Sequence, residues 1–93
     1  MSFIKRLEKN IAKKEKAIDR ERMKIAELKA KCDSHKITRA DFNIKKRHIE
    51  EKIRTLNSRM RVLQGGITKE KRHQEELAEE KERKKEEKKK KKK

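Results

Sequence analysis

Residues 32–42 decide the fold, and they read Cys32-Asp33-Ser34-His35-Lys36-Ile37-Thr38-Arg39-Ala40-Asp41-Phe42. Residues 32–36 interrupt an apolar pattern that precedes them. Thr38 then has the position of a helix N-cap, with Asp41 at the third helical position. Ile37 and Phe42 have the spacing of a hydrophobic staple. Because two start signals agree at one residue, we expect a new helix from about residue 39.

A heptad pattern precedes this turn. Its apolar positions are Ile4, Leu7, Ile11, Ile18, Ile25, Leu28 and Cys32, and the two remaining seam positions are Lys14 and Glu21. A seven-residue repeat of this kind predicts one apolar stripe on a helix. Ser2 is a suitable N-cap, so we expect this helix over residues 3–32.

A second seam follows the turn, at Phe42, Ile49, Ile53, Leu56, Met60 and Leu63. Gly65-Gly66 predicts a helix end near residue 64, because glycine takes the left-handed C′ position without steric cost. Two amphipathic helices joined by a short turn predict an antiparallel hairpin. Two registers fit, in which the numbers of facing residues sum to about 67 or to about 74. The first pairs Ile18 with Ile49, and the second pairs Ile18 with Leu56.

The remaining residues form an extension without a core face, since 25 of the 27 apolar residues lie before residue 68. Thr68 is a candidate cap for a third helix to about residue 85, and the lysine run 88–93 is expected to be disordered when free. The predicted fold class is therefore all-α. It is an antiparallel two-helix coiled-coil hairpin over residues 1–67, with a charged single-helix to disordered extension over residues 68–93.

The charge balance points to a polyanionic partner. Of the 93 residues 54% are charged, and 33 Lys and Arg against 17 Asp and Glu give a formal net charge of +16. Such an excess favours nucleic acid as partner. No run of 18 apolar residues predicts a membrane span, and the single cysteine fits a reducing compartment, so we expect a cytoplasmic protein.

Neither an enzyme, a metal nor a cofactor is expected. Ser34 and His35 are adjacent in sequence, which does not create a nucleophile–base geometry. Cys32, His35 and His48 offer three of the four ligands that a structural zinc site requires. His73 lies in the extension, so we interpret all four as structural or solvated side chains.

Rows of cations are the strongest functional signal. They comprise Arg47, Arg54 and Arg61, then Lys45, Lys52 and Arg59 on the second helix, and Arg6, Lys9, Lys13, Lys16 and Arg20 on the first. Seven residues span about 10.5 Å of helix, so each row is a ladder of cations. On the sequence alone, the two second-helix rows flank one outer face. Guanidinium and ammonium groups in such rows suit phosphate oxygens.

RNA is favoured over DNA. Trp and Tyr are absent, so there is no stacking platform for single-stranded bases, and contact with backbone and shape is expected. A leucine-zipper DNA binder has a basic region separate from its zipper. Here the basic and apolar residues share the same helices.

The run Ile37-Thr38-Arg39-Ala40-Asp41-Phe42-Asn43-Ile44-Lys45-Lys46-Arg47-His48-Ile49 resembles the short helical SHOCT pattern, with Thr38, Phe42, Lys46 and Ile49 at matching positions. The glycine expected before Ile37 is missing. The whole chain also resembles small lysine-rich helical-hairpin proteins associated with the archaeal ribosome. This resemblance implies a ribosomal setting and assigns no residues.

These observations predict a non-enzymatic RNA-binding hairpin, with structured RNA and ribosomal proteins as partners and no membrane contact. The alternative is a structural coiled-coil protein that self-associates or pairs with a partner helix. Because Lys14 and Glu21 oppose a dry four-helix bundle, we expect a monomer when free, with a dimer as the alternative.

Overall fold

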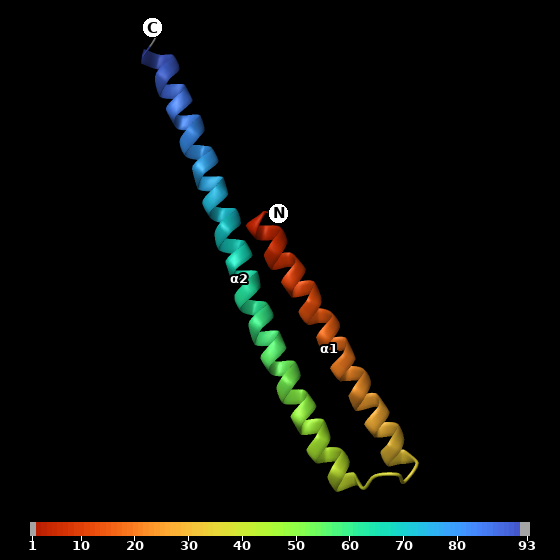
Figure 1. Cartoon of the computed structure of the whole chain (residues 1–93). Coiled ribbons are helices and arrows are strands. Elements are labelled where there is room, and N and C mark those ends of the chain that lie inside the picture. Colours follow the sequence, from red (N-terminus) through yellow and green to blue (C-terminus); the bar gives the residue numbers. More distant parts are fainter. Residues whose placement is uncertain (1, 92–93) are drawn as a thin grey trace.

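A computed structural model describes residues 2–91 and contains two helices and no strand in this range (Figure 1). Helix α1 spans Phe3–Asp33 and helix α2 spans Arg39–Lys91. The predicted all-α class is confirmed. The first helix has the expected bounds to within one residue, whereas the second is far longer than expected.

The predicted N-caps of α1 and α2 are present. The Ser2 side chain accepts a hydrogen bond from the Lys5 backbone N–H, with 3.2 Å between nitrogen and oxygen. The Thr38 hydroxyl oxygen accepts in the same way from the Asp41 N–H at 3.1 Å. Each cap satisfies a backbone donor that has no partner within the helix, and this fixes where both helices begin.

The turn after α1 is a Schellman motif. The Lys36 N–H donates to the Lys31 carbonyl at 2.8 Å, and the His35 N–H donates to the Cys32 carbonyl at 3.0 Å. His35 has a φ of 61°, the left-handed conformation that this motif requires at C′. The position usually belongs to glycine, so a histidine here holds a mildly strained backbone.

Helix α1 runs back along the first part of α2 (Figure 1). Leu7 lies against Gly66, and Lys14 lines the same hollow as Arg59. The residue numbers 7 and 66, and 14 and 59, each sum to 73. The helices therefore adopt the second of the two predicted registers, which places Ile18 opposite Leu56.

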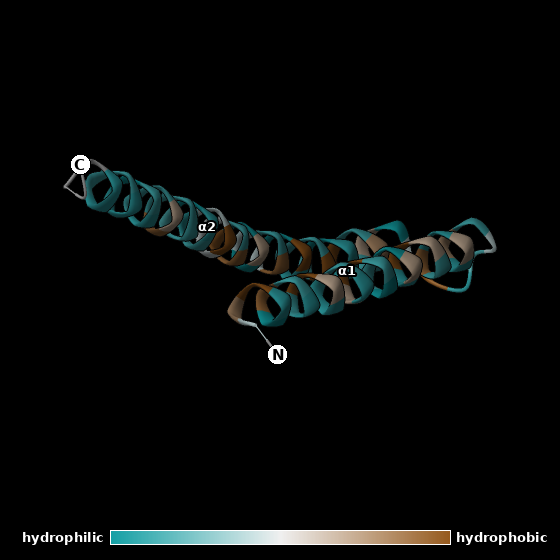
Figure 2. Cartoon of the chain, turned by 90° about the horizontal axis from the view of Figure 1, so that it is seen from above, coloured by the Kyte–Doolittle hydropathy of each residue, from teal (hydrophilic) through white to brown (hydrophobic). Residues whose placement is uncertain are grey.

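Burial between the helices is shallow. Among the described residues only Ile18, Ile49 and Ile67 are buried, with exposed fractions of 5%, 8% and 3%. The other predicted seam residues are half-buried, because each helix covers only one side of the opposing stripe. Brown, apolar turns gather where the helices face each other, and the end of α2 is almost uniformly hydrophilic (Figure 2).

The predicted helix end at Gly65-Gly66 is wrong, since α2 continues through both glycines without positive φ. A Cβ on Gly66 would lie 3.3 Å from the Leu7 Cδ1 atom, while one on Gly65 would meet nothing within 4 Å. Gly66 thus permits a close approach of α1. Burial of the next residue, Ile67, which is 3% exposed, helps to offset the helix-propensity cost of about 1 kcal/mol for Gly66.

The separate third helix is also wrong. Thr68 lies inside α2, where its hydroxyl donates to the Gln64 carbonyl at 3.0 Å in place of capping a new helix. Residues 88–91 of the lysine run, expected to be disordered, are helical, and Lys92 and Lys93 lie outside the described residues. The result is a rod with extents of 85 × 19 × 15 Å.

Candidate nucleic-acid interface

All eleven cations of the predicted interface are exposed. They are Arg6, Lys9, Lys13, Lys16 and Arg20 on α1 and Lys45, Arg47, Lys52, Arg54, Arg59 and Arg61 on α2. Each therefore keeps its charged head in solvent, available to an anion. The regular helices hold their Cα atoms in fixed rows.

These cations are also free of acidic partners. Four ion pairs form among the side chains of residues 2–89, namely Lys24–Glu21, Lys46–Glu50, Arg83–Glu79 and Lys84–Glu80, with N–O distances of 3.1, 3.7, 3.9 and 3.5 Å. None of the four contains any of the eleven cations. A phosphate that binds them does not have to displace a carboxylate first.

The two rows of α2 do not share one face, which corrects the sequence-based placement. Residues two apart on a helix are rotated by about 200°, so Lys45 and Arg47 point to nearly opposite sides. Lys52 and Arg59 line hollows between the helices, whereas Arg61 lines a different hollow with Glu15. We call Lys45, Lys52 and Arg59 the groove row, and Arg47, Arg54 and Arg61 the outer row.

The groove row gains cations from α1. Lys24 and Lys31 line one hollow together with Lys45, and Lys14 shares another with Arg59. Glu27 lines the hollow of Lys24 and Lys31. Glu21 and Glu51 line a third hollow, together with Lys52 and Arg59. One side of the molecule thus carries a long basic groove with charges contributed by both helices.

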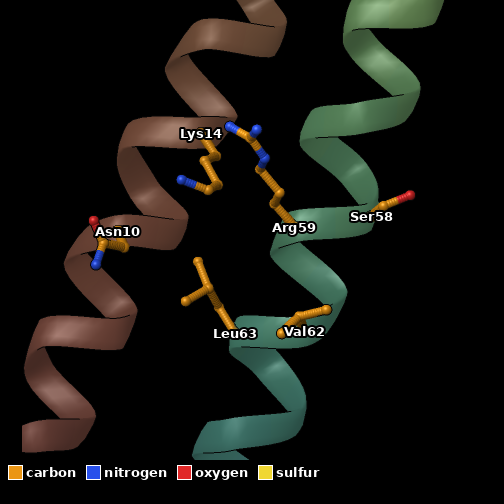
Figure 3. A pocket seen from close by; sticks show the side chains of 6 residues that line it. All are labelled: Asn10, Lys14, Ser58, Arg59, Val62 and Leu63. Atoms are coloured by element: carbon orange, nitrogen blue, oxygen red, sulfur yellow. The ribbon is translucent and has the colours of Figure 1, made fainter.

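Figure 3 shows the hollow that Lys14 and Arg59 line together. Arg59 extends from α2 toward α1 at the level of Lys14, while Leu63 forms an apolar floor between the helices. Val62, at the rim, is 75% exposed. Two cations over an apolar floor suit a phosphate whose attached sugar contacts the aliphatic surface.

The α1 row lies elsewhere, on the side of α1 that faces away from α2. None of its members lines the hollows described above. The eleven predicted cations are therefore distributed over three surfaces: the groove, the opposite side of α2 and the back of α1. A single ligand strand cannot contact all three at once.

Sequence reasoning missed the α1 contribution to the groove. Lys14 was interpreted only as a charge in the apolar seam, and Lys24 and Lys31 were not selected. Each stands beside the seam on the same side as Lys45, but this neighbourhood depends on the register between the helices. Since the heptad pattern allowed two registers, the sequence alone could not identify these partners.

The Glu21 carboxylate lines the groove and is mostly buried. Its side chain is 14% exposed, and its Oε1 atom pairs with the Lys24 ammonium at 3.1 Å. Its Oε2 atom is buried and has no hydrogen-bond partner among the described residues. Lys46 pairs with Glu50, and its Nζ atom lies 5.8 Å from the Phe42 ring centroid.

The turn residues have structural contacts. The Ser34 hydroxyl donates to the Lys31 carbonyl at 3.2 Å, Cys32 is half-buried with a free thiol, and His35 occupies the left-handed position. Across residues 2–91 no three His, Cys, Asp or Glu side chains are grouped to hold a metal ion. Neither helix, over the part of the chain described, has a stretch long and apolar enough to cross a membrane.

Comparisons with known proteins gave no relative: no family model, curated protein or solved structure matches this chain.

Proposed function

We propose that this protein is a non-enzymatic RNA-binding rod that contacts the phosphate backbone of structured RNA, in the cytoplasm, as a component of a ribonucleoprotein particle such as the ribosome. The supporting observation is that all eleven predicted cations are exposed and none belongs to an ion pair among the side chains of residues 2–89. Surfaces of ordinary charged helices mix both signs. Along the groove, by contrast, six Lys and Arg side chains line the hollows against three Glu.

The binding unit in this proposal is an antiparallel coiled-coil hairpin. The contact of Leu7 with Gly66 and the half-buried seam support it. The hairpin supplies a stiff frame, so the groove row and the α1 cations beside it keep their spacing when RNA binds. A preformed site loses less conformational entropy on binding than a disordered basic segment does.

Contact with the backbone follows from the types of side chain at the surface. The rows contain Lys and Arg without Trp or Tyr, and these cations bind phosphate without reading bases. The proposal therefore assigns affinity to charge and shape. Sequence preference among structured RNAs of similar shape is expected to be weak.

The first test is a salt titration with a fluorescently labelled RNA duplex, read by anisotropy. If about six phosphates are neutralised, affinity falls about a thousandfold between 50 and 200 mM salt. A flat salt response would contradict backbone binding. A DNA duplex of the same length serves as the comparison, and tighter binding to DNA would reverse the assignment to RNA.

The second test separates the two faces of α2 with charge-matched variants. Lys52→Glu with Arg59→Glu changes the groove row, and Arg54→Glu with Arg61→Glu changes the outer row by the same charge. We expect the groove variant to lose more affinity, because α1 places Lys14, Lys24 and Lys31 along the groove, whereas the α1 residue beside Arg61 is the acid Glu15. Helix content, measured by circular dichroism, should stay constant. If neither variant loses affinity, these rows are not the RNA contact.

The alternative function, self-association as a structural coiled coil, rests on a separate observation. The seam is only half-covered, and Val62 and Met23 are 75% and 64% exposed. Sedimentation equilibrium at low concentration distinguishes the two. We expect a monomer without RNA, because Lys14 and Glu21 would be costly to bury in a bundle. A tight RNA-free dimer would favour the alternative.

A further inference from the structure

The part of α2 from Lys71 onward, which we call the projecting part, changes the sign of its charge along its length. Residues 75–82, which we call the acidic collar, contain five Glu and one Lys. Residues 83–93 contain nine Lys and Arg against two Glu. Side chains from Lys71 to Lys89 are all exposed. We call the cations Arg83, Lys84, Lys85, Lys88 and Lys89 the terminal cluster.

The acidic collar sits between two cationic regions of one continuous helix. From Arg59 in the groove to Lys84 in the terminal cluster, 25 residues rise by about 37 Å, and the collar accounts for about 12 Å of this. The Debye length at physiological salt is about 8 Å. The two cationic regions are therefore electrostatically separate, and the helix fixes the spacing between them.

Two ion pairs connect the acidic collar with the terminal cluster where these segments meet. Glu79 pairs with Arg83 at 3.9 Å and Glu80 pairs with Lys84 at 3.5 Å. Both pairs have an acid four residues before a base, the favourable order on a helix. These contacts support the helix here, where apolar packing is absent. Lys85, Lys88 and Lys89 have no ion-pair partner among the described residues.

We propose that the terminal cluster is a second phosphate-binding site and that one molecule bridges two separate RNA segments, one at the groove and one at the end of the rod. The inference rests on the proposed function, because the groove supplies the first site. A single straight backbone following the rod would pass the collar, whose carboxylates repel phosphate. Two segments avoid this repulsion.

The test uses full-length protein and two 20-base-pair RNA duplexes, one labelled with a donor and the other with an acceptor fluorophore. Energy transfer should appear when protein is added at less than one molecule per duplex. A variant carrying Lys84→Glu, Lys85→Glu, Lys88→Glu and Lys89→Glu should lose at least tenfold in transfer. Its anisotropy-measured affinity for one duplex should stay within about threefold.

A charge-matched control reverses Lys5, Lys36, Lys69 and Lys71, which are exposed and lie in neither site. This control should keep the transfer signal. Equal loss in both variants would overturn the proposal, since it would reflect net charge alone. Persistent transfer in the terminal-cluster variant would also overturn it, because protein dimers would then explain bridging. Absence of single-duplex binding by wild type would instead refute the proposed function itself.

A second variant tests the fixed spacing. Ala78→Pro breaks the helix inside the collar without changing any charge. Single-molecule transfer between duplexes bridged by wild type should give one narrow distribution of efficiencies. The proline variant should broaden this distribution. An unchanged distribution would contradict a rigid connection between the sites.

Discussion

Two parts of α2 are helical for different reasons. Up to Glu70 the helix packs on α1, and its inward side chains are buried or half-buried. From Lys71 to Lys89 every side chain is exposed, and two acid–base pairs replace apolar contact. The first part owes its helix to tertiary packing, and the second to local propensity and charge order.

Within α2, the part that packs on α1 therefore determines the stability of the fold, and the exposed part mainly contributes charge. The part that packs on α1 determines whether the molecule folds, since the three buried side chains among residues 2–89 lie on α1 or before Lys71. The projecting part contributes cations and length. Changes in the two parts should therefore have unlike effects on unfolding, and the following variants measure that difference.

The largest effect is expected from replacing a large apolar side chain by alanine before Glu70, compared with the same kind of replacement after Glu70. Ile67 is 3% exposed and Leu77 is 45% exposed. Ile67→Ala should destabilise by about 2–5 kcal/mol through lost burial and a cavity. Leu77→Ala should change stability by less than about 0.5 kcal/mol. Urea unfolding followed by helical circular dichroism measures both, and similar losses would mean that the part of α2 beyond Glu70 packs on the rest of the molecule.

The two glycines of α2 also differ, because only Gly66 lies close to α1. Gly66→Val adds bulk at a position where a Cβ atom would lie only 3.3 Å from the Leu7 Cδ1 atom, and overpacking should cost about 1–3 kcal/mol. Gly65→Val faces open space and should be neutral or slightly stabilising, because valine is a better helix former than glycine. Thermal unfolding of both variants tests this. Equal unfolding midpoints for the two variants would mean that the close approach of Leu7 does not require glycine at position 66.

A smaller effect is expected at the turn. His35→Gly relieves a left-handed backbone at φ 61°, which costs an L-residue about 1–2 kcal/mol. Part of this gain is lost, because glycine makes the unfolded chain more flexible. We expect a net stabilisation of about 0.5–1 kcal/mol, seen as a higher thermal midpoint. His35→Ala is the control and should not stabilise.

The smallest effect concerns the ion pairs of the projecting part. Glu80→Gln removes the pair with Lys84 and should cost about 0.3–0.5 kcal/mol of local helix stability. Backbone amide exchange near residue 80 should accelerate, while amides around Ile49 stay protected. The global unfolding midpoint should not move. A shift of that midpoint would mean that the two parts unfold together.

Sequence reasoning succeeded where a signal was local. The Thr38 cap and the seam of Ile18 were predictable, because spacing and residue type alone determine them. The end of α2 was not, since glycine serves both as a helix terminator and as a point of close approach, and only the position of Leu7 distinguishes these roles.

The same limit applied to the interface. Exposure of the α1 row and the outer row followed from their distance to the seam, whereas the groove row is exposed although it lies beside the seam. Their division among three surfaces depended on the register and on the side of α2 that each row occupies. Lys14, which lines a hollow with Arg59, was recognisable as a groove residue only once the register was known.

The elongated shape changes how the molecule moves in solution. Its radius of gyration is 23.8 Å, whereas a globular chain of this length has about 12 Å. A monomer of 11.3 kDa therefore diffuses like a much heavier sphere and leaves a sizing column early. Its long axis also reorients more slowly than its short axes. Amide bonds along the helices consequently relax as those of a larger protein do, although the chain has only 93 residues.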